Sequence, residues 1–119
     1  MYSLIFEIPG LPKTVNQIGR RHWAVKMKEA QEWKLGVMCA CMGKKPLRPL
    51  KVANIFLTRF SRVRPDYDNL VNSFKAVLDG LIDAGIIEND RHENIGVPIY
   101  NWKKYCIKGG KIKVEVYAT

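Results

Sequence analysis

The chain has 119 residues, of which 47% are hydrophobic and 26% are charged, a balance that excludes an intrinsically disordered protein. This length fits one domain, so we expect residues 1–119 to form a single domain that buries its core without metals or disulfides. The 20 basic residues exceed the 11 acidic residues and give a formal charge of +9, which favours a polyanionic partner such as nucleic acid.

The cysteine pattern and the hydropathy of the chain favour a protein of the reducing cytoplasm. Cys39, Cys41 and Cys106 are odd in number and lack the paired spacing of a zinc site, so we expect neither a disulfide framework nor a zinc site. No apolar run reaches the roughly 18 residues of a membrane span, and the first residues lack the pattern of a signal peptide. We therefore expect a cytoplasmic protein with no membrane partner.

The first half of the chain predicts a strand, a helix and a second strand. Residues 2–8 alternate in polarity and end at a run of prolines and glycine, which predicts a strand. Between residue 23 and about residue 42, apolar side chains recur at spacings near three and four, which predicts the first helix. Residues 50–60 carry apolar side chains on both faces, which predicts a strand inside the sheet.

The second half of the chain predicts a helix and two strands. Leu70, Phe74 and Leu81 form an apolar stripe over residues 68–83, which predicts the second helix. Residues 93–102 are predicted as a third strand, and residues 108–111 as a hairpin turn into a last strand over residues 112–117. The order strand, helix, strand, helix, strand, strand predicts an α+β fold, with a mixed four-stranded sheet and two main helices packed on it.

Charge is segregated along the chain. Residues 44–65 contain seven basic residues and no acidic residue, and Asp66 and Asp68 follow directly. In an extended chain two carboxylates at this spacing point the same way, and together they can bind a hard divalent ion beside phosphate and water. The alternative is that these acids, or Asn69, cap the helix that follows.

Two further charged residues are candidates for the same site. In a continuous helix of about 100 degrees per residue, Lys75 falls about 20 degrees from Asp68 and shares its face. Asp90 lies in an acidic turn beyond the helix, and it is near the pair only if the segment after the helix runs back alongside it.

Three successive motifs resemble the RusA family of Holliday junction resolvases. They are Arg-Pro-Asp-Tyr-Asp-Asn-Leu at 64–70, Phe-Lys-Ala-Val-Leu-Asp-Gly-Leu at 74–81 and Ala-Gly-Ile-Ile-Glu-Asn-Asp at 84–90, and the chain length matches from end to end. The resemblance implies a magnesium-dependent structure-specific endodeoxyribonuclease, a hydrolase that resolves Holliday junctions by paired symmetric nicks in DNA recombination and repair.

The resemblance also implies residue roles and partners. Asp66, Asp68 and Asp90 correspond to the family's three metal-binding catalytic aspartates, which hold Mg²⁺, and Lys75 corresponds to its essential lysine. The implied partners are four-way or branched DNA and a second copy of the chain in a homodimer. Two departures concern the site: three more residues separate Asp68 from Lys75 than in the best-known member, and Pro65 replaces the arginine before the first aspartate.

Basic residues on both sides of the first helix and before Asp66 are the candidates for DNA phosphate contacts. They are Arg20, Arg21, Lys44, Lys45, Arg62 and Arg64. His22 and His92 are alternative general bases, although a carboxylate–metal site already activates water. The alternative function is a non-catalytic or differently specific branched-DNA-binding protein of the same fold. A simple binder has no reason to gather three carboxylates beside phosphate, because like charges repel.

Overall fold

The computed structural model describes residues 1–13, 23–89, 91 and 96–119. In this part of the chain four strands form one mixed sheet in the order β1-β4-β2-β3, in which β4 is antiparallel to both of its neighbours and β3 is parallel to β2. The strands are β1 (Ser3–Pro9), β2 (Ala53–Ser61), β3 (Ile99–Lys104) and β4 (Lys111–Ala118). The sheet confirms the predicted α+β fold.

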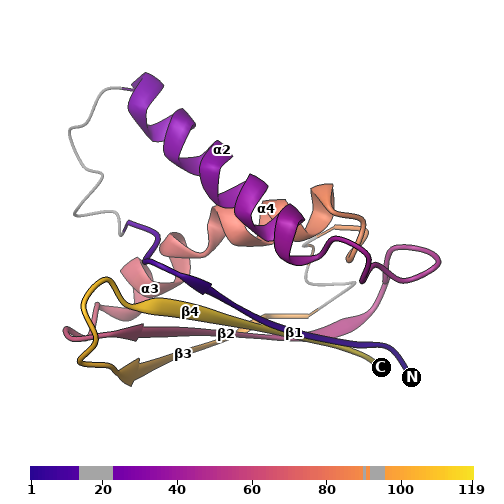
Figure 1. Ribbon diagram of the computed structural model, residues 1–119. Coiled ribbons are helices and arrows are strands. Elements are labelled where there is room, and N and C mark those ends of the chain that lie inside the picture. The colour runs from indigo at the N-terminus through magenta and orange to yellow at the C-terminus, as the bar shows by residue number, and fades with distance from the viewer. Residues whose placement is uncertain (14–22, 90, 92–95) are drawn as a thin grey trace.

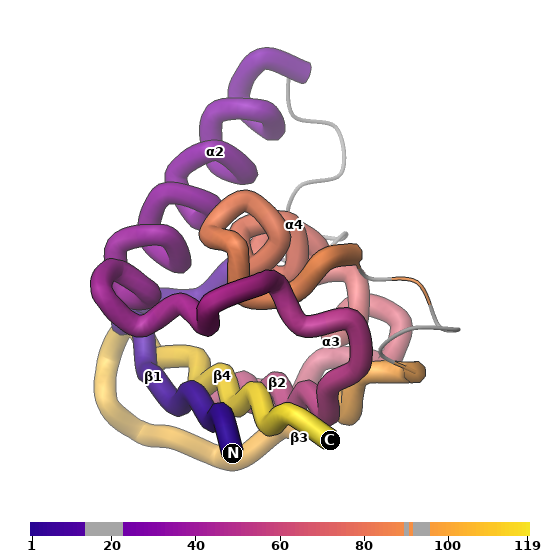
Figure 2. The backbone as a smooth tube through the Cα atoms, turned by 90° about the vertical axis from the view of Figure 1, so that its right-hand side faces the viewer, coloured from indigo at the N-terminus to yellow at the C-terminus, as the bar shows by residue number. Residues whose placement is uncertain are grey.

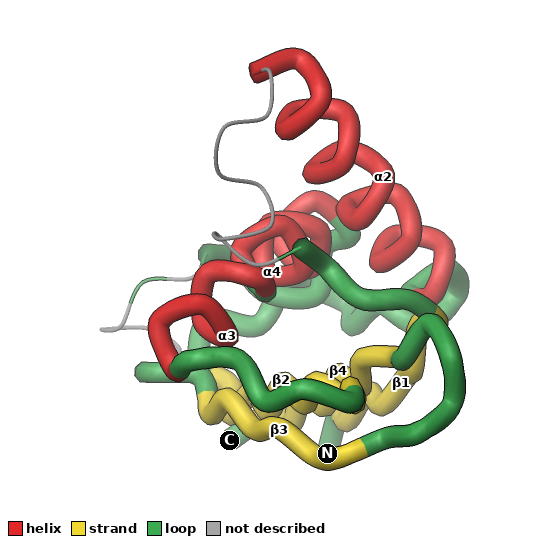
Figure 3. The backbone as a smooth tube through the Cα atoms, turned by 90° about the vertical axis from the view of Figure 1, so that its left-hand side faces the viewer, coloured by secondary structure: helices red, strands yellow, loops and turns green. Residues whose placement is uncertain are grey.

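The described helices all cover the same face of this sheet. They are α2 (Trp23–Ala40), α3 (Tyr67–Ser73) and α4 (Lys75–Asp83). Figure 1 shows them above the strands, and the two side views in Figures 2 and 3 show the same two layers. None of these helices is long and apolar enough to cross a membrane.

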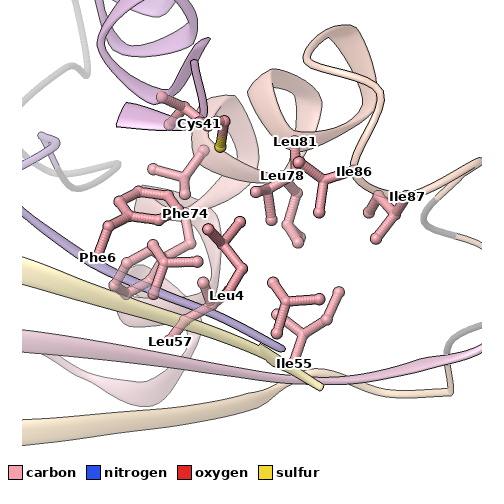
Figure 4. Close-up of a cluster of buried hydrophobic side chains, with 14 of the residues drawn as sticks. Leu4, Phe6, Cys41, Ile55, Leu57, Phe74, Leu78, Leu81, Ile86 and Ile87 are labelled. Carbon is pink, nitrogen blue, oxygen red and sulfur yellow. The ribbon is translucent and has the colours of Figure 1, made fainter. Parts of the chain in front are cut away.

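The core lies between the two layers, where the alternating strand side chains meet the helices. Figure 4 shows Leu4 and Leu57 from the sheet facing Phe74 and Leu81 from the helical layer. Leu57, Phe74 and Leu81 are completely buried, and each such side chain contributes roughly 1.5 to 3 kcal/mol by leaving water. The position predicted for the second strand is confirmed, because β2 lies between β4 and β3.

The predicted helix over residues 68–83 is interrupted in the structure. The backbone of Phe74 has φ −95° and ψ 2° and separates α3 from α4. Its amide donates to the Val71 carbonyl oxygen three residues earlier, at 3.1 Å, and its ring is buried against Tyr100 at a centroid distance of 6.1 Å. The apolar stripe stays on the core side of both helices, so the sequence pattern gives no sign of the break.

The last two strands also differ from the prediction. β3 spans Ile99–Lys104 rather than residues 93–102, and residues 93–95 of the predicted strand lie outside the described part. The predicted hairpin is wrong, because β2 separates β3 from β4 in the sheet. Glycines at 109 and 110 correctly indicate a reversal of the chain, but turn chemistry is local and cannot specify which strand becomes the neighbour. The fully buried Ile112, Val114 and Val116 favour an interior position for β4.

Candidate functional site

A cleft of about 570 Å³ lies at the C-terminal end of β2. Here the strand meets the start of α3 and the connection between β3 and β4, at the left-hand end of the sheet in Figure 1. Of the described residues that line the cleft, four are basic and one is acidic; they are Arg59, Arg62, Arg64, Lys108 and Asp66. The cleft therefore combines a surplus of positive charge with one carboxylate.

Asp66 precedes the first residue of α3 and occupies its N-cap position. Pro65 disfavours helical geometry in the residue before it, and Asp66 itself has the extended angles φ −59° and ψ 152°. Its carbonyl oxygen accepts the Leu70 amide at 2.9 Å, but its carboxylate makes no capping hydrogen bond. An aspartate at this position normally uses its side chain to accept a helix amide; the Asp66 side chain is not used in this way, and Asp66 lines the cleft.

Asp68 and Asn69 lie inside α3, so the structure corrects two expectations. Because the helix begins at Tyr67, neither residue is its cap. Asp68 is helical rather than extended, so strand alternation does not align its side chain with that of Asp66. Asp68 is exposed in the first turn, where its charge complements the helix dipole, and it does not line the cleft. Asn69 does.

The third predicted carboxylate, Asp90, lies outside the described residues. The same is true of Arg20, Arg21, His22 and His92. In the described part of the chain, which does not include Asp90, no group of three or more His, Cys, Asp or Glu side chains is placed to hold a metal ion. The metal assignment of Asp66, Asp68 and Asp90 therefore stays a prediction.

Lys75 begins α4 and does not line the cleft that contains Asp66. Its Nζ is 3.3 Å from Oδ1 of Asp79, and its side chain is 65% exposed. It lines a second cleft with Asn72 and Asp79. The expectation that Lys75 shares a helix face with Asp68 assumed a continuous helix, and the break at Phe74 removes that basis.

The predicted DNA-binding residues in the described part divide between the two ends of the molecule. Arg62 and Arg64 line the cleft, where Arg62 donates to the Cys106 carbonyl oxygen at 3.2 Å and the guanidinium carbon of Arg64 lies 6.0 Å from the Trp102 ring centroid. Lys44 and Lys45 follow α2. The Lys44 carbonyl oxygen accepts the Tyr2 hydroxyl at 2.6 Å, so this pair lies beside the start of β1, at the opposite end of the sheet.

Arg59 is a site residue that the sequence reasoning did not single out. It is only 4% exposed, and its Nη1 donates to the Pro12 carbonyl oxygen at 2.6 Å. Burial lowers the pKa of its guanidinium. A signal was present, because Arg59 continues the alternation of the buried Ala53, Ile55 and Leu57 along β2. A charged residue in a core-facing position is unusual enough to mark a candidate site.

The connection between β3 and β4 also lines the cleft. Gly110 has a φ of +65°, and a Cβ atom there would lie 2.6 Å from the Phe60 carbonyl oxygen and 2.8 Å from the Leu11 side chain. Only glycine fits this close approach. It holds the loop against the end of β2 and so brings Lys108 and Gly109 to the cleft.

No protein-family model matches the chain, and no curated protein matches it at a significant level. The resemblance to the RusA family therefore rests on the three motifs of this chain.

Proposed function

We propose that the protein is a magnesium-dependent structure-specific endodeoxyribonuclease that resolves Holliday junctions by paired symmetric nicks in DNA recombination and repair. The observation that carries the proposal is the position of Asp66, from the RusA-like motif, in a cleft whose other charged lining residues are all basic. Carboxylate oxygen is the ligand that Mg²⁺ prefers, and basic side chains neutralise DNA phosphates. One predicted metal ligand and several basic side chains therefore line the same cleft, which supports the proposal.

The residues of the motif fit a magnesium ion by the chemistry of their donors. Asp66 offers a carboxylate that makes no capping hydrogen bond, and Asp68 and Asp90 supply the other predicted carboxylates. Magnesium bound there supplies Lewis-acid polarisation of the phosphate and activation of water. Arg62 and Arg64, which line the same cleft, contact DNA phosphate and hold the DNA backbone beside Asp66.

Two symmetric nicks in a four-way junction require two sites related by a twofold axis. We therefore propose that the protein acts as a homodimer in which each chain contributes one cleft. A cytoplasmic location agrees with this role, and the three cysteines, all free in the structure, are consistent with a reducing compartment.

The Asp66→Asn and Asp68→Asn variants test the catalytic assignment. We expect each to lower junction cleavage by at least roughly 100-fold, the scale of losing a group that stabilises charge in the transition state. Junction binding should be unchanged or tighter, because an acid beside the phosphates is removed. Cleavage is measured on a cruciform plasmid, where paired nicks give a linear product and single nicks give an open circle.

The exposed Asp83 pairs with Lys34 at 3.9 Å and does not line the cleft, so Asp83→Asn provides the control variant. It should cleave at the wild-type rate. Normal cleavage by Asp66→Asn would contradict the catalytic assignment. Tight junction binding by a wild-type protein that never cleaves would favour the alternative, a non-catalytic or differently specific branched-DNA-binding protein.

Lys75→Ala tests whether this lysine takes part in catalysis as predicted from the resemblance. The exposed pair with Asp79 four residues later stabilises a helix by about 0.3 to 0.5 kcal/mol. The Lys75 side chain is 65% exposed, and changes at exposed positions usually alter stability by at most about 0.5 kcal/mol, so the variant should unfold at nearly the wild-type denaturant concentration. If Lys75 is catalytic, the cleavage rate falls while stability and junction binding are retained; a wild-type rate would remove Lys75 from the proposed site.

A further inference from the structure

Arg59 is a buried cation for which the described part of the fold supplies no counter-charge. Its side chain takes part in none of the described ion pairs. Nη1 donates to a neutral carbonyl, that of Pro12, and Nε is the one buried side-chain nitrogen or oxygen in the described residues that has no hydrogen-bond partner. A buried guanidinium stays protonated, and burying a charge without an anion is costly. The missing partner is therefore an anion.

The place where that anion can enter is the cleft. Arg59 belongs to the strand that forms its floor, and Arg62, Arg64 and Lys108 line it together with Arg59. Arg62 is held by its bond to the Cys106 carbonyl oxygen, and Arg64 lies over the Trp102 ring. Neither contact is with a carboxylate, so the positive charges of Arg62 and Arg64 remain available to an anion that enters the cleft.

The number and type of these cations indicate a phosphate group. A carboxylate ligand carries one charge and two oxygens, whereas phosphate presents more oxygens and suits the forked guanidinium of arginine. Three arginines converge on the cleft. Gly110 lets the loop that carries Lys108 pack against the Phe60 carbonyl oxygen and the Leu11 side chain, which holds Lys108 at the cleft.

We propose that Arg59 forms the floor of a phosphate-binding subsite in this cleft, with Arg62, Arg64 and Lys108 around its mouth. Bound phosphate supplies the counter-charge that Arg59 lacks and accepts hydrogen bonds from its guanidinium. The identification of this phosphate as a DNA phosphodiester rests on the proposed function, whereas the subsite itself rests on Arg59. Arg59 is then a substrate-positioning residue that fixes one phosphate relative to Asp66.

The first experiment uses the unmodified protein, so it does not depend on whether a variant folds. Nitrogen-15 NMR follows the Nε–Hε resonance of Arg59 during titration with inorganic phosphate, at fixed pH and at an ionic strength held constant with sodium chloride. A second titration uses a short DNA oligonucleotide without divalent metal. We expect a saturable shift of this resonance in at least one titration. If neither ligand moves it, the proposal is overturned.

The two ligands distinguish the source of the phosphate. A shift with the oligonucleotide that disappears when uncharged methylphosphonates replace its phosphates identifies the DNA backbone as the ligand. A shift with inorganic phosphate alone supports the subsite and assigns it to a free phosphate.

The second experiment compares Arg59→Met with Arg48→Met. Arg48 is exposed in the loop after α2 and does not line the cleft. Both variants lose one positive charge, so Arg48→Met controls for the change in net charge. Arg59→Met should bind the titrated ligand at least about tenfold more weakly, the loss of one charge-assisted contact, while Arg48→Met retains wild-type affinity. Equal affinity of the two variants would overturn the proposal.

Cleavage assays separate this proposal from the proposed function. If the protein binds phosphate through Arg59 but never cuts junctions, the subsite is supported and the nuclease assignment is contradicted. If Arg59→Met cuts junctions at the wild-type rate, the nuclease assignment stands and Arg59 does not position a DNA phosphate for cleavage.

Discussion

Cys41 lies directly after α2 with its thiol in the core, as Figure 4 shows. Burial is the larger influence on this group and raises its pKa from 9.0 to about 11, while the charge of Lys44 acts in the opposite direction. A thiol with so high a pKa is almost entirely protonated at neutral pH, and the thiolate is the reactive form. Cys41 should therefore be inert, in contrast to the exposed Cys39 and Cys106.

This raised pKa makes stability depend on pH in the alkaline range. Between pH 9.0 and about 11 the unfolded chain loses the Cys41 proton while the folded chain keeps it. The unfolded state then binds fewer protons, so the free energy of unfolding falls as pH rises through this window. The loss is at most about 2 to 3 kcal/mol, since one pKa unit corresponds to about 1.4 kcal/mol.

Urea unfolding below and above pH 9.0 measures this dependence, with Cys41→Ala as the comparison. The free energy of unfolding of the variant should fall less steeply as pH rises. Some dependence should remain, because the pKa of Tyr2 is also raised, first by burial and then by Cys41. An identical pH dependence in the two proteins would show that Cys41 is not its source.

At the scale of elements, α2 and α4 approach each other closely at Gly80. A Cβ atom on Gly80 would lie 2.8 Å from the Val37 Cβ and 3.2 Å from the Lys34 Cα. We expect Gly80→Ala to lower the free energy of unfolding by about 1 to 3 kcal/mol, because overpacking outweighs the better helix propensity of alanine. Denaturant midpoints measure the change.

Gly36, in the middle of α2, is the matched control. Apart from its chain neighbours and the adjacent backbone of α2 itself, no described atom would lie within 4 Å of a Cβ at this position. Gly36→Ala should raise the free energy of unfolding by up to about 1 kcal/mol, because alanine is the better helix former. A stabilising effect of the same size at both glycines would contradict the close approach of α2 and α4.

The elements that the sequence predicted correctly are those whose pattern reports burial directly. Apolar side chains on both faces of residues 50–60 predicted the interior position of β2. The break at Phe74 escaped prediction because both helices keep their apolar side chains toward the core. The position of β4 escaped it because strand order depends on contacts between distant residues, such as Leu57 with Val114, and not on the turn at 108–111.

The candidate site could be predicted only in part for similar reasons. The motif located Asp66 at the start of a helix, and the structure places it in a cleft. The motif gave no indication of Arg59, because the role of Arg59 depends on its burial at the end of β2 and on its missing counter-charge. Lys75 illustrates the opposite error. Its predicted position on the same helix face as Asp68 assumed one continuous helix, and the helix is interrupted at Phe74.

At the scale of the whole molecule, variants of the predicted DNA-binding residues test which end of the sheet binds DNA. Neutralising a phosphate contact changes the slope of log affinity against log salt by about 0.9. The double variant Arg62→Gln/Arg64→Gln should therefore make the slope for junction binding shallower by about 2. Lys44→Gln/Lys45→Gln changes the same net charge at the opposite end of the sheet and should leave the slope near that of the wild type.

Fluorescence anisotropy with a labelled four-way junction, in the absence of divalent metal, gives both slopes. Equal reductions in the two double variants would indicate that DNA contacts both ends of the molecule. A reduction only in the lysine variant would place the DNA away from the cleft and would contradict the proposed site.

The insertion of β4 between β1 and β2 has a consequence for how the protein folds during synthesis. Ser3 pairs with Tyr117, and Ala53 pairs with Ala118, so β1 cannot join the sheet until β4 has left the ribosome. Sheets that join distant segments form slowly, because loop closure must precede the contacts that repay it. Until then, the edges of β1 and β2 that β4 will cover remain open to pairing with other chains. The strand that completes the core is thus also the one that protects the nascent chain from aggregation.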